Sequence, residues 1–552
     1  MVALVLLVAI TTGIRFDNGP IYDDPHVLEG GIIDRPELAL QALTERTMFI
    51  SRAGKKLPPE VDTYRPIPAE SFFLNAAISG RKLWSYHLLN LLLHVGCVLL
   101  LFSLIRRFIG RGRIKAAALG AGFFAVHPWL AEAHVWINGR SDPLALLFGL
   151  GAALVLIGKR PTPARLAGAF VLFFCGLASK ETLLVTIPAF LFLDPKRTSS
   201  WRDRILRVVP LVIAAVAYLA LRVRILHGMK THPNTSALLS AAARGPALLV
   251  DALFRLLVPE TPFFRSLRDD FVGLSAALLA GALVVVLVLA YLVFRYRKTL
   301  TSAPFAALFF AGALAPVAGI TMQVWPGYGR YLYLPAAGLA VLLAEIGARY
   351  GRRLQGNAKK IGAAVLALYF VVMAALLVNF TRDMSGNEPF YMTATEKRPN
   401  QAYGFGFLGA HYLTIGDDDP GIGALKRAVE LDPLDHRYRS NLVHALMRHG
   451  RCEEAVPLAM TGLERFGSTS FAPAFHAALG KCAPTVELAV RNLHLCILTD
   501  LDANIEFCDK KLRERVATDP KARAALRDAM KQVPNVAFDA EWGPLVRDSA
   551  PE

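Results

Sequence analysis

Two adjacent carboxylates, Asp23 and Asp24, stand where an apolar opening stretch, residues 1–17, gives way to polar sequence. Charged groups are costly in hydrocarbon and cheap a few ångströms outside it, so the simplest interpretation is a solvated loop start. A carboxylate at a membrane interface can also act as a general base on a hydroxyl, provided that partial burial keeps water away from it. Taken alone, the pair fits either interpretation.

A second group of polar residues lies in two segments, 86–94 and 127–142. His87, Asn90 and His94 are spaced so that a helix places them on one stripe, and an ionisable group at the depth expected for His94 is either functional or paired. Histidine and glutamate can bind a metal ion, but we favour hydrogen bonds from the histidines to the backbone and to neighbouring helices. The candidate pocket residues here are His87, His94, His127, Glu132, His134, Asn138, Arg140 and Asp142.

Two cations, Lys180 and Arg330, each stand close to the outer end of an apolar segment, flanked by Glu181, Tyr331 and Tyr333. Together they would suit a phosphate at the depth of lipid headgroups, with Arg330 as a planar fork and Lys180 as a point charge. For each cation singly, contact with the headgroups of the lipids themselves is the alternative. The sequence has no glycine-rich phosphate loop and no dinucleotide fingerprint, which argues against direct use of ATP or a nucleotide sugar.

Apolar helices are the elements that must position these residues. The chain has 552 residues, of which 54% are hydrophobic and 19% are charged, and its formal net charge is +17. A nucleic-acid-binding protein of that charge would lack long apolar runs, whereas a polytopic membrane protein holds its Lys and Arg in cytoplasmic loops. We therefore predict an all-α chain with about eleven spans, at 1–17, 85–105, 115–132, 143–158, 165–179, 182–194, 206–222, 272–294, 303–321, 331–348 and 361–379.

The basic loops orient these spans, because Lys and Arg collect on the cytoplasmic side. An additional span at 245–260 would turn the last two basic loops outward, so we interpret that segment as an interfacial or re-entrant helix. The N-terminus is then cytoplasmic, and the acidic pair, the two cations and everything after Asn379 lie outside. The first apolar run has no cleavage motif, which argues against a cleaved signal peptide. It is shorter than the ~20 residues that a span needs, so we expect that the helix continues towards Asn18 or that the chain begins further upstream. The loops assigned to the cytoplasm are 106–115, 159–165, 194–207, 295–298 and 349–360.

From about residue 400 the composition becomes that of a soluble helical domain. Residues 402–433 and 437–466 repeat one helix-pair layout after about 34 residues, the period of a tetratricopeptide repeat, and a third unit from about 470 is degenerate. If this domain is extracytoplasmic, its even number of thiols suggests two disulfides, most simply between sequence neighbours, with free buried thiols as the alternative. The four cysteines are Cys452, Cys482, Cys496 and Cys508.

Several strings in the chain resemble the integral-membrane GT-C glycosyltransferases, most closely the transmembrane and tetratricopeptide-repeat O-mannosyltransferase group and its bacterial relatives. They occur in the order of that group and cover most of residues 1–470. The resemblance implies a GT-C membrane domain at 1–380, with a first outer loop at about 18–84, and an extracytoplasmic tetratricopeptide-like domain at 400–552. The strings are YDD (22–24), YRPIPAESFFLNAAISGRKLWSYHLLNLLLH (64–94), FFAVHPWLAEAHVWINGRSDPLALLF (123–148), LASKETLLVTIPAFLFLD (177–194) and GRYLYLPAAGLAVLL (329–343).

The activity that the resemblance implies is an inverting transfer of a sugar, with mannose the most familiar, from a polyprenyl-phosphate-linked donor to a protein Ser or Thr hydroxyl. Asp23 would be the catalytic aspartate, and Asp24 would orient groups or bind the acceptor. Which of the two acids is the base stays open. Lys180 and Arg330, with Arg140, would hold the donor phosphate. A divalent metal near the acidic pair is possible and stays open.

Other functions remain as alternatives. Transfer of another sugar to a lipid or a surface glycan would use the same fold, and a non-enzymatic membrane scaffold whose repeats bind partners would not need the acidic pair. We expect an integral protein of a bacterial inner membrane with its C-terminal domain in the periplasm. The expected partners are the lipid bilayer, the lipid-linked donor and a protein or glycan acceptor, which the repeats could help to bind, and not nucleic acid.

Overall fold

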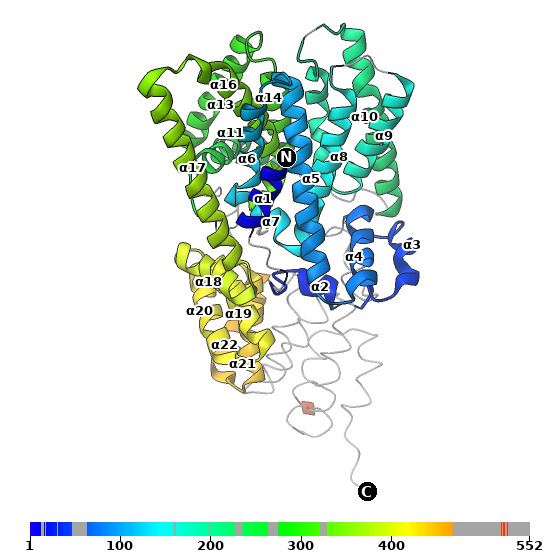
Figure 1. The fold of residues 1–552 in the computed structure, drawn as a ribbon. Helices are drawn as coiled ribbons and strands as arrows, with labels where there is room; N and C mark the ends of the chain where they lie inside the picture. Colours follow the sequence, from blue (N-terminus) through cyan, green and yellow to red (C-terminus); the bar gives the residue numbers. More distant parts are fainter. Residues whose placement is uncertain are drawn as a thin grey trace. The chain divides into compact units, whose positions relative to one another are not determined.

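The computed structural model describes residues 1–12, 18–29, 31–46, 63–158, 162–196, 198–226, 235–262, 274–320 and 328–466, together with a few single residues. Every regular element in these ranges is a helix, which confirms the predicted all-α class. The chain divides into two compact units, Met1–Thr393 and Ala394–Glu552 (Figure 1).

The first unit is built almost entirely from apolar helices joined by short loops. The segments 47–62, 227–234, 263–273 and 321–327 lie outside the described residues. Its elements are α1 (Val2–Thr11), α2 (Asp24–Leu28), η1 (Pro36–Leu38), α3 (Ala39–Ala42), α4 (Pro66–Ser79), α5 (Trp84–Ile109), α6 (Ile114–Ala125), η4 (Pro128–Leu130), α7 (Ala131–His134), η5 (Ile137–Arg140), α8 (Ser141–Leu156), α9 (Pro163–Leu177), η6 (Glu181–Phe192), α10 (Trp201–Ile225), α11 (Thr235–Leu257), α13 (Ala276–Tyr296), α14 (Ala303–Ile320), α15 (Tyr328–Tyr331), α16 (Tyr333–Tyr350), η7 (Gly351–Arg353) and α17 (Gly356–Asp383).

Each predicted apolar segment coincides with a helix, but not every helix is long enough to cross a bilayer. Five are long and apolar enough, namely α5, Ile137–Leu156, α10, α13 and α17, and the pair Ile114–Ala125 and Pro128–His134, bent by 56°, adds a sixth. Helices such as α1 and η6 fall short of the ~20 residues that a span needs. The described part of the chain therefore establishes an integral membrane protein and does not confirm eleven spans.

Two of the long helices expose their apolar side chains. The most apolar window of α13 has no buried residue, and only 11% of that of α17 is buried. Val284 and Leu287 on α13, like Leu368 and Val371 on α17, are each more than half exposed. Such surfaces suit hydrocarbon, where a helix satisfies its own backbone groups.

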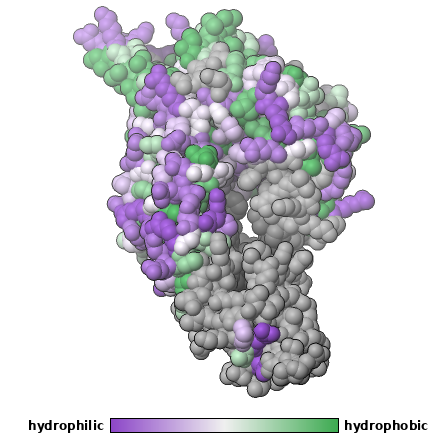
Figure 2. Space-filling model, turned by 90° about the horizontal axis from the view of Figure 1, so that it is seen from below, coloured by the Kyte–Doolittle hydropathy of each residue, from purple (hydrophilic) through white to green (hydrophobic). Residues whose placement is uncertain are grey.

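In Figure 2, hydrophilic side chains predominate over the described part of the face shown and hydrophobic ones gather near its upper rim.

Small residues allow the helices around the centre of this unit to approach closely. Helix α5 packs against α6, α8 and α16, and α14 packs against η6 and α16. A Cβ atom at Gly120 of α6 would lie 2.7 Å from the Cβ of Ala344 on α16, and one at Gly312 of α14 would lie 2.4 Å from the carbonyl oxygen of Val185. Contact between helices in a membrane depends on this kind of close packing, because lipid supplies no hydrophobic drive between them.

The second unit contains two helix pairs, at the positions of the two predicted repeats. Helix α18 (Asn387–Lys397) runs into it, and α19 (Ala402–Ile415), α20 (Asp418–Leu431), α21 (His436–Arg448) and α22 (Cys452–Phe466) follow. Ala445 and Ala455 are buried where α21 meets α22, and Gly409 lets α19 approach α20. The tetratricopeptide character stays a prediction. The third unit and Cys482, Cys496 and Cys508 lie outside the described residues.

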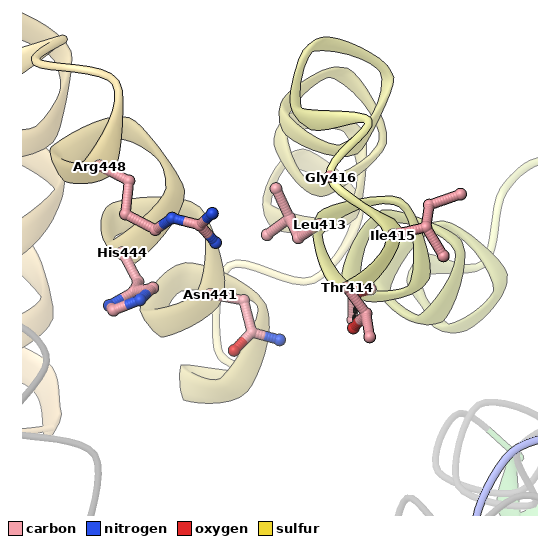
Figure 3. Close-up of a pocket in the computed structure, with 8 residues that line it drawn as sticks. Leu413, Thr414, Ile415, Gly416, Asn441, His444 and Arg448 are labelled. Carbon is pink, nitrogen blue, oxygen red and sulfur yellow. Dashed lines mark hydrogen bonds between the residues drawn. The ribbon is translucent and has the colours of Figure 1, made fainter. Parts of the chain in front are cut away.

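A groove of about 660 Å³ lies between the end of α19 and the face of α21 (Figure 3). Asn441, His444 and Arg448 form its polar wall on α21, and Leu413 and Thr414 stand opposite them on α19. This groove belongs to the second unit alone, and none of the predicted site residues lines it.

Candidate active site

Asp24 begins the short helix α2 and is almost fully buried, with 1% of its surface exposed. Its Oδ2 accepts the backbone N–H of Ile21 at 3.1 Å, and its Oδ1 accepts the backbone N–H of Asn138 at 2.9 Å. Burial raises the pKa of Asp24, as does the neighbouring charge of Asp23, while the two N–H donors and Arg140 oppose the increase. Both oxygens of this carboxylate are therefore engaged in joining two loops far apart in the sequence.

The residue before the acidic pair has an unusual backbone. Tyr22 has φ 53°, a left-handed conformation that side-chain-bearing residues rarely adopt. Its N–H donates to Oδ1 of Asn387 at 2.7 Å, and its ring meets the edge of Trp136 at 5.5 Å between centroids. Asp23 follows directly and is half-buried as a residue, whereas Asp24 is buried, although Oδ1 of Asp23 is itself shielded from solvent.

Arg140 lies at the end of η5, in the turn that leads into α8, and is completely buried. Its guanidinium donates to Oδ1 of Asn75 at 2.7 Å and to Oγ of Ser71 at 3.1 Å, both on α4, and lies 4.1 Å from the ring centroid of Phe72. A role for Arg140 at the donor phosphate stays a prediction. In the structure its hydrogen bonds to Asn75 and Ser71 hold α4 against η5.

Lys180 caps the start of η6 and is paired in the interior of the protein. Its Nζ lies 2.6 Å from both Oδ1 and Oδ2 of Asp142, and both side chains are at least 96% buried. The same Nζ lies 4.9 Å from the ring centroid of Tyr331. Burial lowers the pKa of Lys180 to about 8, Asp142 opposes that decrease, and the positive charges of Arg330 and Arg65 add to it.

Arg330, on α15, also lies close to the ring of Tyr331. Its guanidinium carbon lies 5.3 Å from the ring centroid of Tyr331 and 4.8 Å from that of Trp136, while its backbone N–H donates to Oε2 of Glu132 at 3.2 Å. Burial alone would lower the pKa of Arg330, but Tyr331, Asp23 and Asp142 outweigh it and raise the pKa. The acidic loop, Asp142 and both cations thus share one electrostatic site.

The four histidines singled out in the sequence all donate to backbone carbonyls. His87 donates to Asn18 at 3.0 Å, His127 to Leu256 at 3.0 Å, His134 to Leu130 at 3.0 Å and His94 to Ala125 at 3.3 Å. The rings of His94 and His134 stack with centroids 4.0 Å apart, and Nδ1 of His94 accepts the hydroxyl of Tyr333 at 2.7 Å. These contacts give the imidazoles a structural role in tying helices together.

Several curated proteins are similar to parts of this chain. It is 28% identical over 153 residues to a protein O-mannosyl-transferase of Caenorhabditis elegans, a match that covers 28% of this chain and 22% of that protein. It is 42% identical over 95 residues to the human protein O-mannosyl-transferase TMTC2 (17% and 11%) and 26% identical over 154 residues to human TMTC3 (27% and 16%). The chain resembles the TMTC-type protein O-mannosyltransferases. This confirms the resemblance expected from the sequence motifs.

The matches to the TMTC-type proteins span less than a quarter of the length of each of these three relatives. No protein-family model matches the chain, and no solved structure matches it. The arrangement of the candidate site therefore comes from the structure of this chain alone.

Sequence reasoning missed several residues of the site in this TMTC-like chain. Arg65 forms a two-point ion pair with Glu181, at 3.0 and 2.8 Å, which joins the start of α4 to the start of η6 beside Lys180. Arg65 and Trp136 lie within the motif strings, so a signal is present, although nothing in the strings singles them out. Asn387 and Tyr391, near the acidic pair, carry no sequence signal.

The sequence leaves a metal site near the acidic pair open. Among the described residues, no group of three or more His, Cys, Asp or Glu side chains is arranged to hold a metal ion. Asp24 directs both oxygens to backbone N–H groups, so its carboxylate is committed to the loops that it joins. We therefore derive no step through a metal.

Proposed function

We propose that the chain is an inverting glycosyltransferase that moves a sugar, mannose in the first instance, from a polyprenyl-phosphate-linked donor to a protein Ser or Thr hydroxyl. The observation that carries the proposal is the joining of acid and cation in one site. Lys180 and Arg330 lie 4.9 and 5.3 Å from the ring centroid of Tyr331, and both Asp23 and Asp142 raise the pKa of Arg330. The reaction needs a carboxylate that accepts the proton of the acceptor hydroxyl, and cations that bind the leaving phosphate. The similarity to named O-mannosyltransferases supports the sugar and the acceptor.

Asp23 is the base in this proposal. Asp24 is buried, and both its oxygens accept backbone N–H groups, so its carboxylate holds loops together. Asp23 is partly exposed and adjoins the cationic part of the site. A general base must reach the proton that it removes, which favours the more accessible member of the pair.

Lys180 and Arg330 stabilise the leaving group. As the acceptor oxygen bonds to the anomeric carbon, its proton passes to Asp23 and the bond from that carbon to the phosphate oxygen breaks. The polyprenyl phosphate leaves with an additional negative charge, and displacement from the opposite face inverts the anomeric configuration. Fixed cations placed where charge develops lower the barrier most effectively in a site that excludes water.

The chain's orientation completes the proposal. In the proposed orientation the basic loops are cytoplasmic, and the acidic pair, both cations and the second unit lie on the extracytoplasmic side, where a lipid-linked sugar would be used. The proposed membrane is a bacterial inner membrane. The second unit is then a tetratricopeptide-like domain that contributes to acceptor binding. Transfer to a lipid or surface glycan would leave the chemistry of Asp23 unchanged, whereas a membrane scaffold would not need it.

The deciding experiment is Asp23→Asn in the purified full-length protein, assayed with polyprenyl-phosphate mannose and acceptor polypeptides. We expect transfer to fall by about 10²- to 10⁴-fold, the usual contribution of a general base, while the thermal unfolding midpoint stays unchanged. Glu29→Gln, an exposed carboxylate of the same loop, is the matched control and retains activity. Wild-type activity in Asp23→Asn rejects the assignment of Asp23 as the base. If the sugar is instead found on a lipid or a glycan, the proposed protein acceptor is rejected.

A further inference from the structure

The stretch of chain that contains the acidic pair runs beside the segment that follows the last apolar helix. The backbone N–H of Gly19 donates to the carbonyl of Ser385 at 2.8 Å, and Nδ2 of Asn18 donates to the carbonyl of Met384 at 3.3 Å. A Cβ atom at Gly19 would lie 3.4 Å from the carbonyl oxygen of Ser385, so the two backbones are in close contact. Residues about 366 positions apart in the sequence therefore form one structure.

The contact closest to the acidic pair comes from Asn387. Its Oδ1 accepts the N–H of Tyr22 at 2.7 Å, at the residue whose φ of 53° turns the chain immediately before Asp23. A left-handed conformation in a tyrosine is unfavourable, and it persists only where the surroundings hold it. The edge contact with Trp136 holds the ring, and Asn387 holds the backbone.

Tyr391, one turn further along α18, supports the same loop. Its side chain is buried, with 3% exposed. Burial raises the pKa of Tyr391, and Tyr22, Asp23 and Asp24 raise it further, which means that its hydroxyl lies within electrostatic reach of the acidic pair. The segment 384–391 thus contacts the acidic loop at its start and at its turn, and Tyr391 lies within electrostatic reach of the two carboxylates.

We propose that Asn387 is a positioning residue for the reaction, because it fixes the left-handed turn at Tyr22 that aims Asp23 into the site. The inference rests on the proposed function, since it gives Asp23 the role of base. It assigns to the end of the membrane unit a part in catalysis that the apolar pattern of the sequence does not indicate. Asn387 itself does not touch the reacting atoms.

The test combines Asn387→Ala and Asn387→Asp in the full-length protein with two measurements. Hydrogen exchange of peptides covering residues 18–28 reports the turn directly, and steady-state kinetics report its effect. We expect Asn387→Ala to speed exchange and to lower kcat on the order of tenfold to a hundredfold without raising the donor KM, since misplacing a catalytic group costs rate. Glu396→Ala, an exposed position on the same helix, leaves both measurements unchanged.

Asn387→Asp separates positioning from a general structural role. Its carboxylate still accepts the N–H of Tyr22, so exchange stays slow, but the new negative charge raises the pKa of Asp23. The acidic limb of the pH–rate profile then moves to higher pH, because the base must be deprotonated. An unmoved limb, or normal exchange in Asn387→Ala, overturns the proposal.

Failure of the proposed function remains distinguishable from failure of this inference. If Asp23→Asn is active, the base assignment fails, whatever the exchange data show. If Asp23→Asn is inactive while Asn387→Ala exchanges fast at full activity, only the positioning role fails. In the double variant, Asn387→Ala adds no further loss to Asp23→Asn, because residues that act through one group are not additive.

Discussion

The carboxylate of Asp24 accepts the backbone N–H of Asn138 at 2.9 Å, across 114 positions of sequence. This bond attaches the loop that carries the acidic pair to the turn that leads from the bent helix pair into α8. Asp23 and Asp24 are therefore different kinds of acid although they are neighbours. Backbone N–H groups hold the carboxylate of Asp24, whereas the charge of Asp23 raises the pKa of Arg330.

Replacing Asp24 should damage the fold before it damages the chemistry. In Asp24→Asn one of the two N–H groups faces an amide NH₂ instead of an oxygen, so a buried donor loses its partner, at a cost of about 1–3 kcal/mol. We expect a lower thermal unfolding midpoint in detergent, in contrast with the unchanged midpoint of Asp23→Asn. Equal midpoints for the two variants would contradict the assignment of roles.

Lys180 should give donor binding a pH dependence. Its pKa is lowered to about 8, chiefly by burial, so the ammonium is present below pH 8 and is lost as the pH rises above it. The donor KM should stay flat below pH 8 and rise about tenfold per unit well above it, because only the charged form attracts phosphate. Lys180→Arg keeps its charge and should abolish this rise, and a rise that persists would point to another group.

We expect donor binding to depend on the planar shape of the Arg330 guanidinium as well as on its charge. The guanidinium lies over Trp136 and beside Tyr331, and an ammonium keeps the charge but not the stacking or the fork geometry. Loss of a cation–π contact costs about 0.5–2 kcal/mol, so the donor KM of Arg330→Lys should rise by up to roughly thirtyfold. Arg382→Lys, at an exposed position at the end of α17, is the control. An increased acceptor KM with normal donor KM would be evidence against phosphate binding.

We expect Arg140 to contribute to the stability of the fold and not to donor binding. Its guanidinium is fully buried against Asn75, Ser71 and Phe72, and a hydrophobic replacement leaves Oδ1 of Asn75 without this donor. Leaving a buried polar group without its partner costs about 1–3 kcal/mol, so Arg140→Met should lower the unfolding midpoint. The fraction that remains folded should keep its donor KM. A stable variant with a raised donor KM would restore Arg140 to the phosphate site.

The oxidation state of the cysteines tests whether the second unit lies outside the cytoplasm. Of the six cysteines in the chain, Cys97 and Cys175 carry free thiols, and the disulfide proposal concerns the other four. Alkylation in denaturant without reductant should label two thiols, and after reduction it should label six, as read by intact mass. Six labelled thiols without reductant would remove the disulfides and weaken the extracytoplasmic placement of the second unit.

The sequence alone determined which segments are helical and which loops are rich in Lys and Arg. Both follow from local pattern, since apolar runs of span length and the sign of the loop charges depend on neighbouring residues only. The motif strings also single out Asp23, Lys180 and Arg330, because each stands where an apolar segment ends. The number of spans stays a prediction, because hydropathy does not record how long each helix runs before it bends or stops, as at the 56° break before η4.

Only the tertiary structure decided what each charged residue does. Arg140, Lys180 and Arg330 look alike in sequence, yet the first is enclosed by α4, the second is paired with Asp142 and the third stacks on Trp136. The bond from Tyr22 to Asn387 joins residues 365 positions apart. Such contacts depend on how helices distant in sequence pack together, and the free energy of a buried charge is set by those packed neighbours rather than by its neighbours along the chain.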